Sequence, residues 1–239
     1  MGEFNKYGLS RTIPAEVKRQ VRQKCGFGCV VCASPIVEYE HVEPTFALAK
    51  EHSPDAITLL CPTCHAKVTR RIYSKEKIKK AMLEPAALKI GKITDKLDFS
   101  DDEPLIQFAG QTFINCQIPV MFEGEPLLQV EKEDDAILIS GRFYDSKGKL
   151  SLEIIRNEWV CGTGSWDITV IGPEISVIEK SRGPRLVLLV EPPKKLIIKR
   201  FDMLIRGVRL FGNADRLRVG NLVFSNSVIV NGRIGFNIN

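Results

Sequence analysis

The spacing of hydrophobic residues divides the chain near residue 104. Before that point, apolar residues recur at helical spacing over about residues 14–24, 62–71 and 75–82. Two short apolar runs, residues 36–41 and 57–60, predict strands. After it, apolar and polar residues alternate through many short segments, which is typical of strands. The pattern therefore predicts an α+β chain in which a small mixed module precedes an all-β domain.

We expect three segments in this chain. Residues 11–84 form the mixed module, and residues 104–239 form the all-β domain. Residues 85–103 are expected to be a linker because they show little regular periodicity and end in an acidic run. A β-sandwich is the expected architecture of the all-β domain. A short β-solenoid is the alternative, ranked second because no repeat of fixed period is present.

Charge and chemistry are concentrated in the first third of the chain. Residues 1–85 hold 14 Lys and Arg against 9 Asp and Glu, while the remainder holds 20 of each. The whole formal net charge of +5 therefore comes from the N-terminal module. All three histidines and five of the seven cysteines lie there too. A basic excess favours a polyanionic partner such as a nucleic acid.

Composition excludes several classes of protein. A hydrophobic fraction of 44% with 26% charged residues is ordinary for a globular chain and excludes disordered, collagen-like and coiled-coil classes. No stretch approaches the roughly 18 consecutive apolar residues that a membrane span needs, and the first ten residues lack the apolar region of a signal peptide. We therefore expect a soluble, cytoplasmic protein without a membrane partner.

Two Cys-x-x-Cys pairs predict a structural zinc site. Cys29 and Cys32 form the first pair, and Cys61 and Cys64 form the second. Each pair lets two sulfurs approach one tetrahedral ion, and four thiolates close its coordination shell. Cys25, four residues before the first pair, is expected to be a thiol packed beside the site, with a role as alternative ligand left open. A closed site of this kind does no catalysis by itself.

The sequence around these cysteines resembles the HNH endonuclease family. The segments are CVVC at 29–32, EYEHVEP at 38–44 and ITLLCPTCHAKV at 57–68. The family order is Cys-x-x-Cys, an acidic residue with histidine, asparagine, and Cys-x-x-Cys-His, and these segments match it in the four cysteines and both histidines. The resemblance covers about residues 11–83. It implies a ββα-metal, treble-clef-like module that hydrolyses DNA phosphodiester bonds.

The resemblance also implies roles for single residues. His41 matches the general base that takes a proton from water, and an imidazole with a pKa near ~6.5 suits that role. Glu40 and His65 match the ligands of one catalytic divalent metal, Mg²⁺ or another hard cation. Glu38 or Glu43 is expected to orient an imidazole. Phosphate contacts are expected from the basic residues of the last helix of the motif, Lys67, Arg70 and Arg71.

One position departs from the family pattern and keeps a second function open. Ala56 stands where the pattern has asparagine, and Asp55 is a substitute only if the loop is offset. His52 lies in a polar loop and is expected at the surface. The alternative function is a non-catalytic zinc module that binds nucleic acid or protein.

The all-β domain resembles no family, so its role is open. We expect it to target or sense, to bind a regulatory partner, or to form a homo-oligomer. By analogy alone, an HNH unit fused to such a domain suits restriction, anti-phage defence or mobile-element biology.

Overall fold

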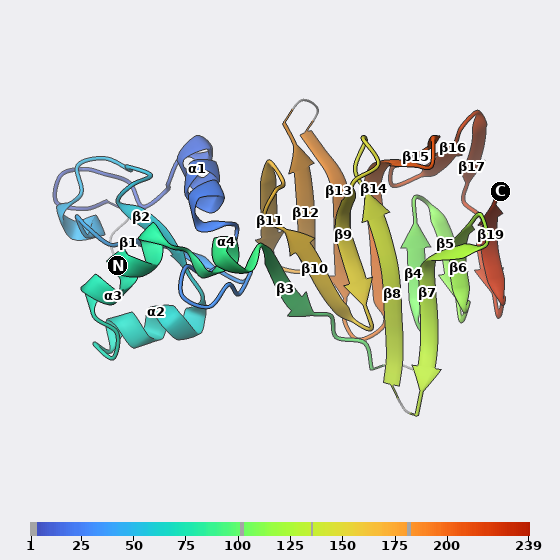
Figure 1. The fold of residues 1–239 in the computed structure, drawn as a ribbon, viewed down its shortest axis with the longest axis horizontal. Helices are drawn as coiled ribbons and strands as arrows, with labels where there is room; N and C mark the ends of the chain where they lie inside the picture. The colour runs from blue at the N-terminus through green and yellow to red at the C-terminus, as the bar shows by residue number, and fades with distance from the viewer. Residues whose placement is uncertain (1–3, 101–102, 135, 181–182) are drawn as a thin grey trace. The chain divides into compact units, whose positions relative to one another are not determined.

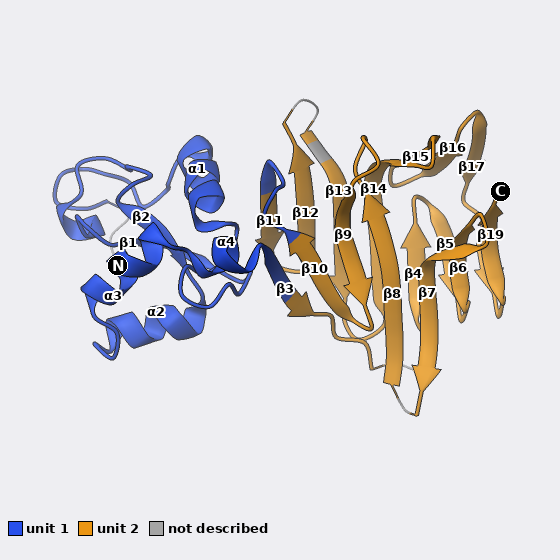
Figure 2. Ribbon diagram, viewed as in Figure 1, with its two compact units in different colours: residues 1–94, 162–167 blue, residues 95–161, 168–239 orange. Residues whose placement is uncertain are grey.

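The computed structural model describes residues 4–100, 103–134, 136–180 and 183–239. The chain divides into two compact units (Figure 2). Unit 1 comprises residues 1–94 and 162–167, and unit 2 comprises residues 95–161 and 168–239. The helices lie in unit 1 and strands dominate unit 2, so the predicted α+β class is confirmed. Among the described residues, no helix has the length and apolar character needed to cross a membrane.

Unit 1 is built around an antiparallel pair of strands (Figure 1). Strand β1 (Glu38–His41) pairs with β2 (Ile57–Leu60), and His41 lies opposite Ile57. The preceding helix α1 packs against β2, and α2 packs against both strands. The helical elements of this unit are α1 (Ala15–Cys25), the 3-10 helix η1 (Phe46–Leu48), α2 (Pro62–Thr69), α3 (Lys75–Leu83) and α4 (Ala86–Ile90).

Local chemistry accounts for the helix boundaries in unit 1. Pro62 opens α2, where its missing N–H breaks no intrahelical hydrogen bond. The side chain of Ser74 caps α3 by accepting a hydrogen bond from the backbone N–H of Lys77. Helix α1 ends at Gly26, whose φ of 69° is left-handed and suits glycine.

The core of unit 1 holds the strand pair in place. Every residue of β2 is buried, with Leu59 and Leu60 at 0% exposure. Val21 of α1 and Ile78 of α3 close the same cluster from the helices. Cysteines from both Cys-x-x-Cys pairs belong to this core. The end of β1 that carries the candidate chemistry is therefore supported by packed side chains.

The segment expected to be a linker contains regular structure. Helix α4 lies there, followed by β3 (Lys92–Lys96). Ala87 and Ile93 are both fully buried. Helix α4 spans little more than one turn, and β3 contains a single apolar residue, Ile93, so the apolar pattern did not reveal them.

Unit 2 consists of strands arranged in two sheets. One sheet has the order β19-β6-β7-β8-β9-β10-β3, and the other has β11-β12-β13-β14-β15-β16-β17, to which β4, β5 and β18 are joined through β14. The bounds are β4 (Leu105–Phe108), β5 (Gln111–Ile114), β6 (Ile118–Phe122), β7 (Glu125–Glu133), β8 (Ala136–Tyr144), β9 (Leu150–Ile155), β10 (Glu158–Gly162), β11 (Asp167–Ile171), β12 (Glu174–Glu179), β13 (Gly183–Glu191), β14 (Lys195–Ile205), β15 (Val208–Gly212), β16 (Arg216–Val219), β17 (Leu222–Ser225), β18 (Val228–Val230) and β19 (Ile234–Ile238).

The alternation that predicted strands places apolar side chains between the sheets of unit 2. Strands β8 and β14 contact each other across this core (Figure 1). Phe143 of β8 is fully buried, and the rings of Phe108 and Phe201 lie 4.4 Å apart between centroids. Burial alternates along β8, as the period of two requires.

The close packing at Gly212 makes a prediction about the stability of unit 2. A Cβ added there would lie 2.4 Å from Cε1 of Phe201 and 2.6 Å from Cβ of Ala109, and both neighbours are buried. We expect G212A to lower the free energy of unfolding by about 1–3 kcal/mol because the core cannot expand freely. Denaturant unfolding measures this.

Gly162 provides the matched control for that substitution. The nearest atom to a Cβ added at Gly162 is 3.9 Å away. G162A should therefore change the free energy of unfolding by less than about 0.5 kcal/mol. Equal losses in G212A and G162A would contradict the tight packing at Gly212.

Candidate functional site

The two Cys-x-x-Cys pairs meet in one cluster. The ligand atoms of Cys29, Cys32, Cys61 and Cys64 all lie within 4.8 Å of one another. The Sγ atom of Cys32 is 3.6 Å from Sγ of Cys61 and 3.9 Å from Sγ of Cys64. Four sulfurs at ~2.3 Å from a central zinc ion would lie roughly 3.8 Å apart. The cluster is therefore compatible with a structural zinc site, as predicted.

Burial controls the acidity of these thiols. It raises the pKa of Cys32 to about 11 and also raises the pKa of Cys64. Burial acts in the same direction on Cys61, but hydrogen bonds from the backbone N–H of Cys64 and from neighbouring thiols lower the pKa of Cys61 overall. That N–H belongs to the first turn of α2, where a helix favours a thiolate. A zinc ion would displace the protons that remain.

Cys25 lies outside the cluster. Its Sγ atom is 3.6 Å from Oγ1 of Thr58, and its side chain is buried. Burial raises the pKa of the Cys25 thiol. This is the environment of a packed thiol, which was the first expectation for Cys25.

His65 lies between two carboxylates of β1. Its Nε2 atom is 3.0 Å from Oε2 of Glu40, and its Nδ1 atom is 2.9 Å from Oε2 of Glu38. Side chains alternate along a strand, so Glu38 and Glu40 lie on the same face of β1. Adjacent residues on a helix point about 100° apart. Cys64 can therefore face the cysteine cluster while His65 faces the strand.

The Glu40 and His65 pair fits part of a divalent cation site. Ligands in neighbouring positions of an octahedral site with bonds of ~2.1 Å lie roughly 3.0 Å apart. The distance between Oε2 of Glu40 and Nε2 of His65 has this value. Within the described ranges these residues are not part of a group of three protein ligands, and the remaining positions of a cation would fall to water and phosphate oxygens.

His41 is buried at the end of β1 and forms a hydrogen bond with a second histidine. Its Nε2 atom is 3.1 Å from Nδ1 of His52, and Nε2 of His52 is 2.9 Å from the backbone oxygen of Ser10. Its ring packs against that of Phe46 in a T-shaped arrangement, with 5.5 Å between ring centroids. Burial and, to a smaller extent, His52 and Arg11 lower the pKa of His41. A neutral imidazole is the form that can accept a proton.

The expectation that His52 lies at the surface is wrong. Its side chain is half-buried and both of its ring nitrogens have hydrogen-bond partners. The neighbouring Lys50 and Glu51 are exposed, as the polar loop suggested. The loop folds back onto the end of β1, however, and that return is a tertiary contact that local polarity does not reveal.

A small cavity borders the end of β1. Its volume is about 20 Å³, and a buried water needs about 10–15 Å³. The cavity therefore has room for one water molecule. It is lined by the polar side chains of Glu40, His41 and Lys75 and by the apolar residues Val42, Leu60, Val68 and Ile78. Lys75 had no signal in the sequence that separated it from the other lysines of α3.

Neither residue considered for the asparagine position approaches His41 with a polar side chain. Ala56 is buried, and its backbone oxygen accepts a hydrogen bond from Val42 at 2.9 Å. Asp55 is 84% exposed and ion-paired with Lys24. Asp55 therefore does not take the role proposed for an offset loop.

The residues expected to contact phosphate differ in their surroundings. Helix α2 ends at Thr69, so Arg70 and Arg71 lie beyond it, and Arg71 reverses the chain with a φ of 60°. Both arginines are exposed. The Nζ atom of Lys67 lies 3.4 Å from the hydroxyl of Tyr73 and 5.2 Å from the centre of its ring.

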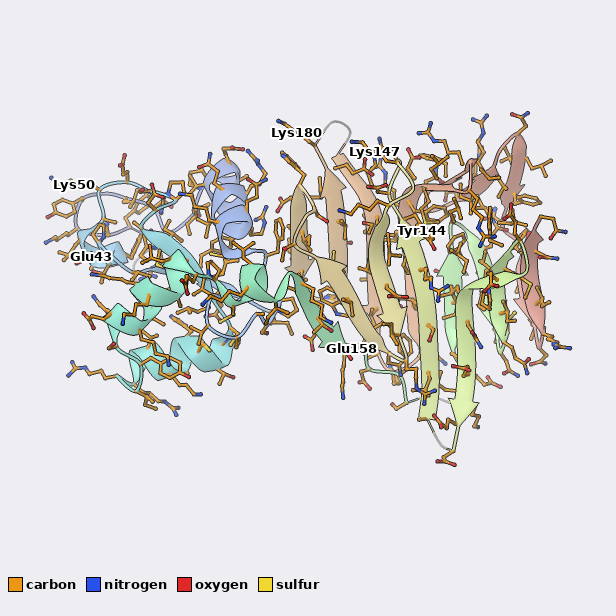
Figure 3. All side chains as sticks on the ribbon, in the orientation of Figure 1. Glu43, Lys50, Tyr144, Lys147, Glu158 and Lys180 are labelled. Atoms are coloured by element: carbon orange, nitrogen blue, oxygen red, sulfur yellow. The ribbon has the colours of Figure 1, made fainter. Side chains whose placement is uncertain are left out.

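The two glutamates considered as orienting groups also differ. Glu38 contacts His65, whereas Glu43, labelled in Figure 3, forms an ion pair with Lys79 of α3. Glu38 is therefore the carboxylate placed to orient an imidazole.

The chain matches none of the protein-family models, curated proteins or solved structures with which it was compared. No family is shown for it by these comparisons. Its function has to be argued from the cysteine cluster, from the Glu38, Glu40 and His65 group, and from the cavity beside His41.

The cysteine cluster makes a prediction about metal content. We expect the purified protein to hold roughly one zinc ion per chain. C29S should lose most of that zinc and unfold at lower temperature, because Cys29 is fully buried among the four thiols. Elemental analysis and thermal unfolding measure the two effects.

The substitution C25S is the matched control for C29S. Cys25 is also buried but lies outside the cluster, so C25S should keep its zinc. Retention of zinc by C29S, or its loss from C25S, would contradict the proposed ligand set.

Proposed function

We propose that this protein is a metal-dependent endonuclease of the HNH type that hydrolyses DNA phosphodiester bonds. The observation that carries the proposal is the convergence of three groups at the end of β1. A buried neutral imidazole, a carboxylate paired with a second imidazole, and a cavity with room for one water meet there. The order of Cys-x-x-Cys, Glu-His and Cys-x-x-Cys-His supports the same assignment.

In this proposal His41 is the general base. Its lowered pKa keeps the imidazole neutral at physiological pH, so it can take a proton from a water in the adjacent cavity. The water oxygen then forms a bond to phosphorus while the bond from phosphorus to the 3′ oxygen breaks. The proton removed from water resides on His41 at the end of this step.

Glu40 and His65 would hold the catalytic divalent cation, such as Mg²⁺. When bound there, the cation supplies Lewis-acid stabilisation of charge on the phosphate and the leaving oxygen. Glu38 accepts a hydrogen bond from Nδ1–H of His65 in this arrangement, at the observed 2.9 Å. That bond leaves the lone pair of Nε2 on the side of Glu40 and fixes the orientation of the ring.

Basic residues around the cavity support a nucleic-acid substrate. Lys75 borders the cavity, and Lys77 and Lys80 follow it on the exposed part of α3. Arg70 and Arg71 are exposed in the segment between α2 and α3. Cations at this density attract phosphates and neutralise them on binding.

The cysteine cluster has a supporting role in the proposal. Cys61 caps the start of α2, Cys64 lies in its first turn, and His65 follows Cys64 directly. A zinc ion would hold this turn against the first Cys-x-x-Cys pair. The position of His65 relative to β1 would then depend on zinc, although zinc itself takes no part in the reaction.

A non-catalytic zinc module that binds nucleic acid is the second candidate. The observation that favours it is Ala56, whose methyl group can neither orient a loop nor bind metal. This candidate predicts salt-sensitive DNA binding that does not depend on Mg²⁺ or Mn²⁺.

Plasmid cleavage tests the nuclease proposal. We expect the wild type to nick or linearise supercoiled DNA with Mg²⁺, Mn²⁺ or Ni²⁺ and to be inactive in EDTA. H41A should lose about 10²–10⁴-fold in rate because the base is gone, while its zinc content stays unchanged. D55A is the control, since Asp55 is 84% exposed, and it should cleave normally. Full activity of H41A would remove His41 from the mechanism, and DNA binding without cleavage under every metal would favour the second candidate.

The pair of glutamates on β1 provides a graded test of the metal site. E40Q removes a proposed ligand, so it should raise the Mg²⁺ concentration needed for half-maximal cleavage strongly. E38Q leaves both ligand atoms in place and should raise it less, within about 10–100-fold. Titration of cleavage rate against Mg²⁺ measures both effects. An E38Q effect larger than that of E40Q would reverse the assignment of ligand and orienting residue.

A further inference from the structure

We infer that His52 is a positioning residue that holds His41 as the tautomer with a proton on Nε2. His41 then presents Nδ1 as its unprotonated nitrogen. The hydrogen-bond chain that carries this inference runs from His41 through His52 to the backbone of Ser10. The hydrogen bonds are observed in the structure and do not depend on the proposed function. Only the catalytic role given to the tautomer of His41 rests on that proposal.

The contact with Ser10 decides which atoms donate in this series of hydrogen bonds. A backbone carbonyl oxygen accepts hydrogen bonds and cannot donate one. Nε2 of His52 lies 2.9 Å from that oxygen and must therefore carry a proton. A neutral imidazole has one N–H, so Nδ1 of neutral His52 is an acceptor.

The direction continues to His41. Nε2 of His41 lies 3.1 Å from Nδ1 of His52. When both rings are neutral, Nδ1 of His52 accepts, so Nε2 of His41 donates. Neutral His41 then has its lone pair on Nδ1, and among the described residues no group is hydrogen-bonded to that atom. In the proposed reaction Nδ1 is the atom that takes the proton from water.

The loop that carries His52 is held close to β1 by other contacts. The side-chain amide of Asn5 donates hydrogen bonds to the backbone oxygens of Phe46 at 2.6 Å and Ala49 at 2.7 Å. Ala49 is fully buried. Phe46 in turn lies against the ring of His41 and carries the guanidinium of Arg11 on its own ring. These contacts keep His52 within hydrogen-bond distance of the base.

The role assigned to His52 is one that position 56 cannot perform in this chain. Ala56 has no polar side-chain atom, and its backbone oxygen is already bonded to Val42. A histidine from the loop between β1 and β2 thus supplies a side-chain contact to the base from a different part of the same loop.

Nitrogen NMR of the histidine rings tests the inference directly. The chain has three histidines, so full-length zinc-loaded protein labelled with ¹⁵N at histidine gives three ring systems, assigned by H41A, H52A and H65A. At about pH 8, above the ordinary histidine pKa, we expect both His41 and His52 with their proton on Nε2. A proton on Nδ1 of His41 in the wild type would overturn the inference. This measurement is made on the wild type, and the three variants serve only to assign its signals.

Substitution of His52 supplies the second readout. In H52A the ring of His41 should show a mixture of tautomers, whereas H52Q, whose side-chain oxygen can accept from His41, should restore the proton to Nε2. D55A in the same loop should leave the His41 spectrum unchanged. An H52A spectrum identical to the wild type, with zinc retained, would overturn the role of His52.

Cleavage kinetics separate this inference from the proposed function. H52A should lower kcat by roughly tenfold or more with little change in KM, a smaller loss than that of the base itself. Partial recovery of kcat in H52Q would support positioning. A protein with the expected tautomers but no cleavage would remove the nuclease proposal and leave the His41–His52 contact intact. If cleavage needs His41 but His41 carries its proton on Nδ1, the nuclease proposal stands and the role of His52 is contradicted.

Discussion

Four sulfur atoms from two separate Cys-x-x-Cys pairs lie within 4.8 Å of one another, and three of these cysteines share one core with β2, α1 and α3. Burial disfavours the charged thiolate form of these groups, as the raised pKa of Cys32 shows. A zinc ion removes this cost by taking all four as thiolates. Because Cys64 is bound to the cluster, the following turn of α2 directs His65 onto β1.

The four residues of strand β1 include two carboxylates and one imidazole, which have different partners. Glu38 and Glu40 share the face that His65 contacts, whereas His41 bonds to the loop after the strand. The cavity at the end of the strand is bordered by both Glu40 and His41. The proposed hydrolysis needs such an arrangement, since the group proposed to activate water and the groups proposed to bind a cation must act on one phosphate without binding each other.

The two imidazoles are controlled by different partners. His65 has carboxylates at both nitrogens, which suits a ligand that is held by one of them and shares a cation with the other. His41 instead is hydrogen-bonded to His52 and packs against Phe46, and burial is the largest cause that lowers its pKa. The difference in surroundings is the physical basis for assigning the metal to one histidine and proton transfer to the other.

Local order along the chain determined much of unit 1 and of the candidate site. The strand over residues 57–60 and the helix behind Ser74 follow from apolar spacing and a capping hydroxyl, which act over a few residues. The meeting of the two Cys-x-x-Cys pairs follows from their metal-ligand spacing. The pairing of Glu40 with His65 followed from the same ordered motif. Tertiary structure alone decided that His52 reaches His41 and that Lys75 borders the cavity. These positions depend on where loops return in space, and loop closure is set by contacts far apart in the sequence, which no local pattern encodes.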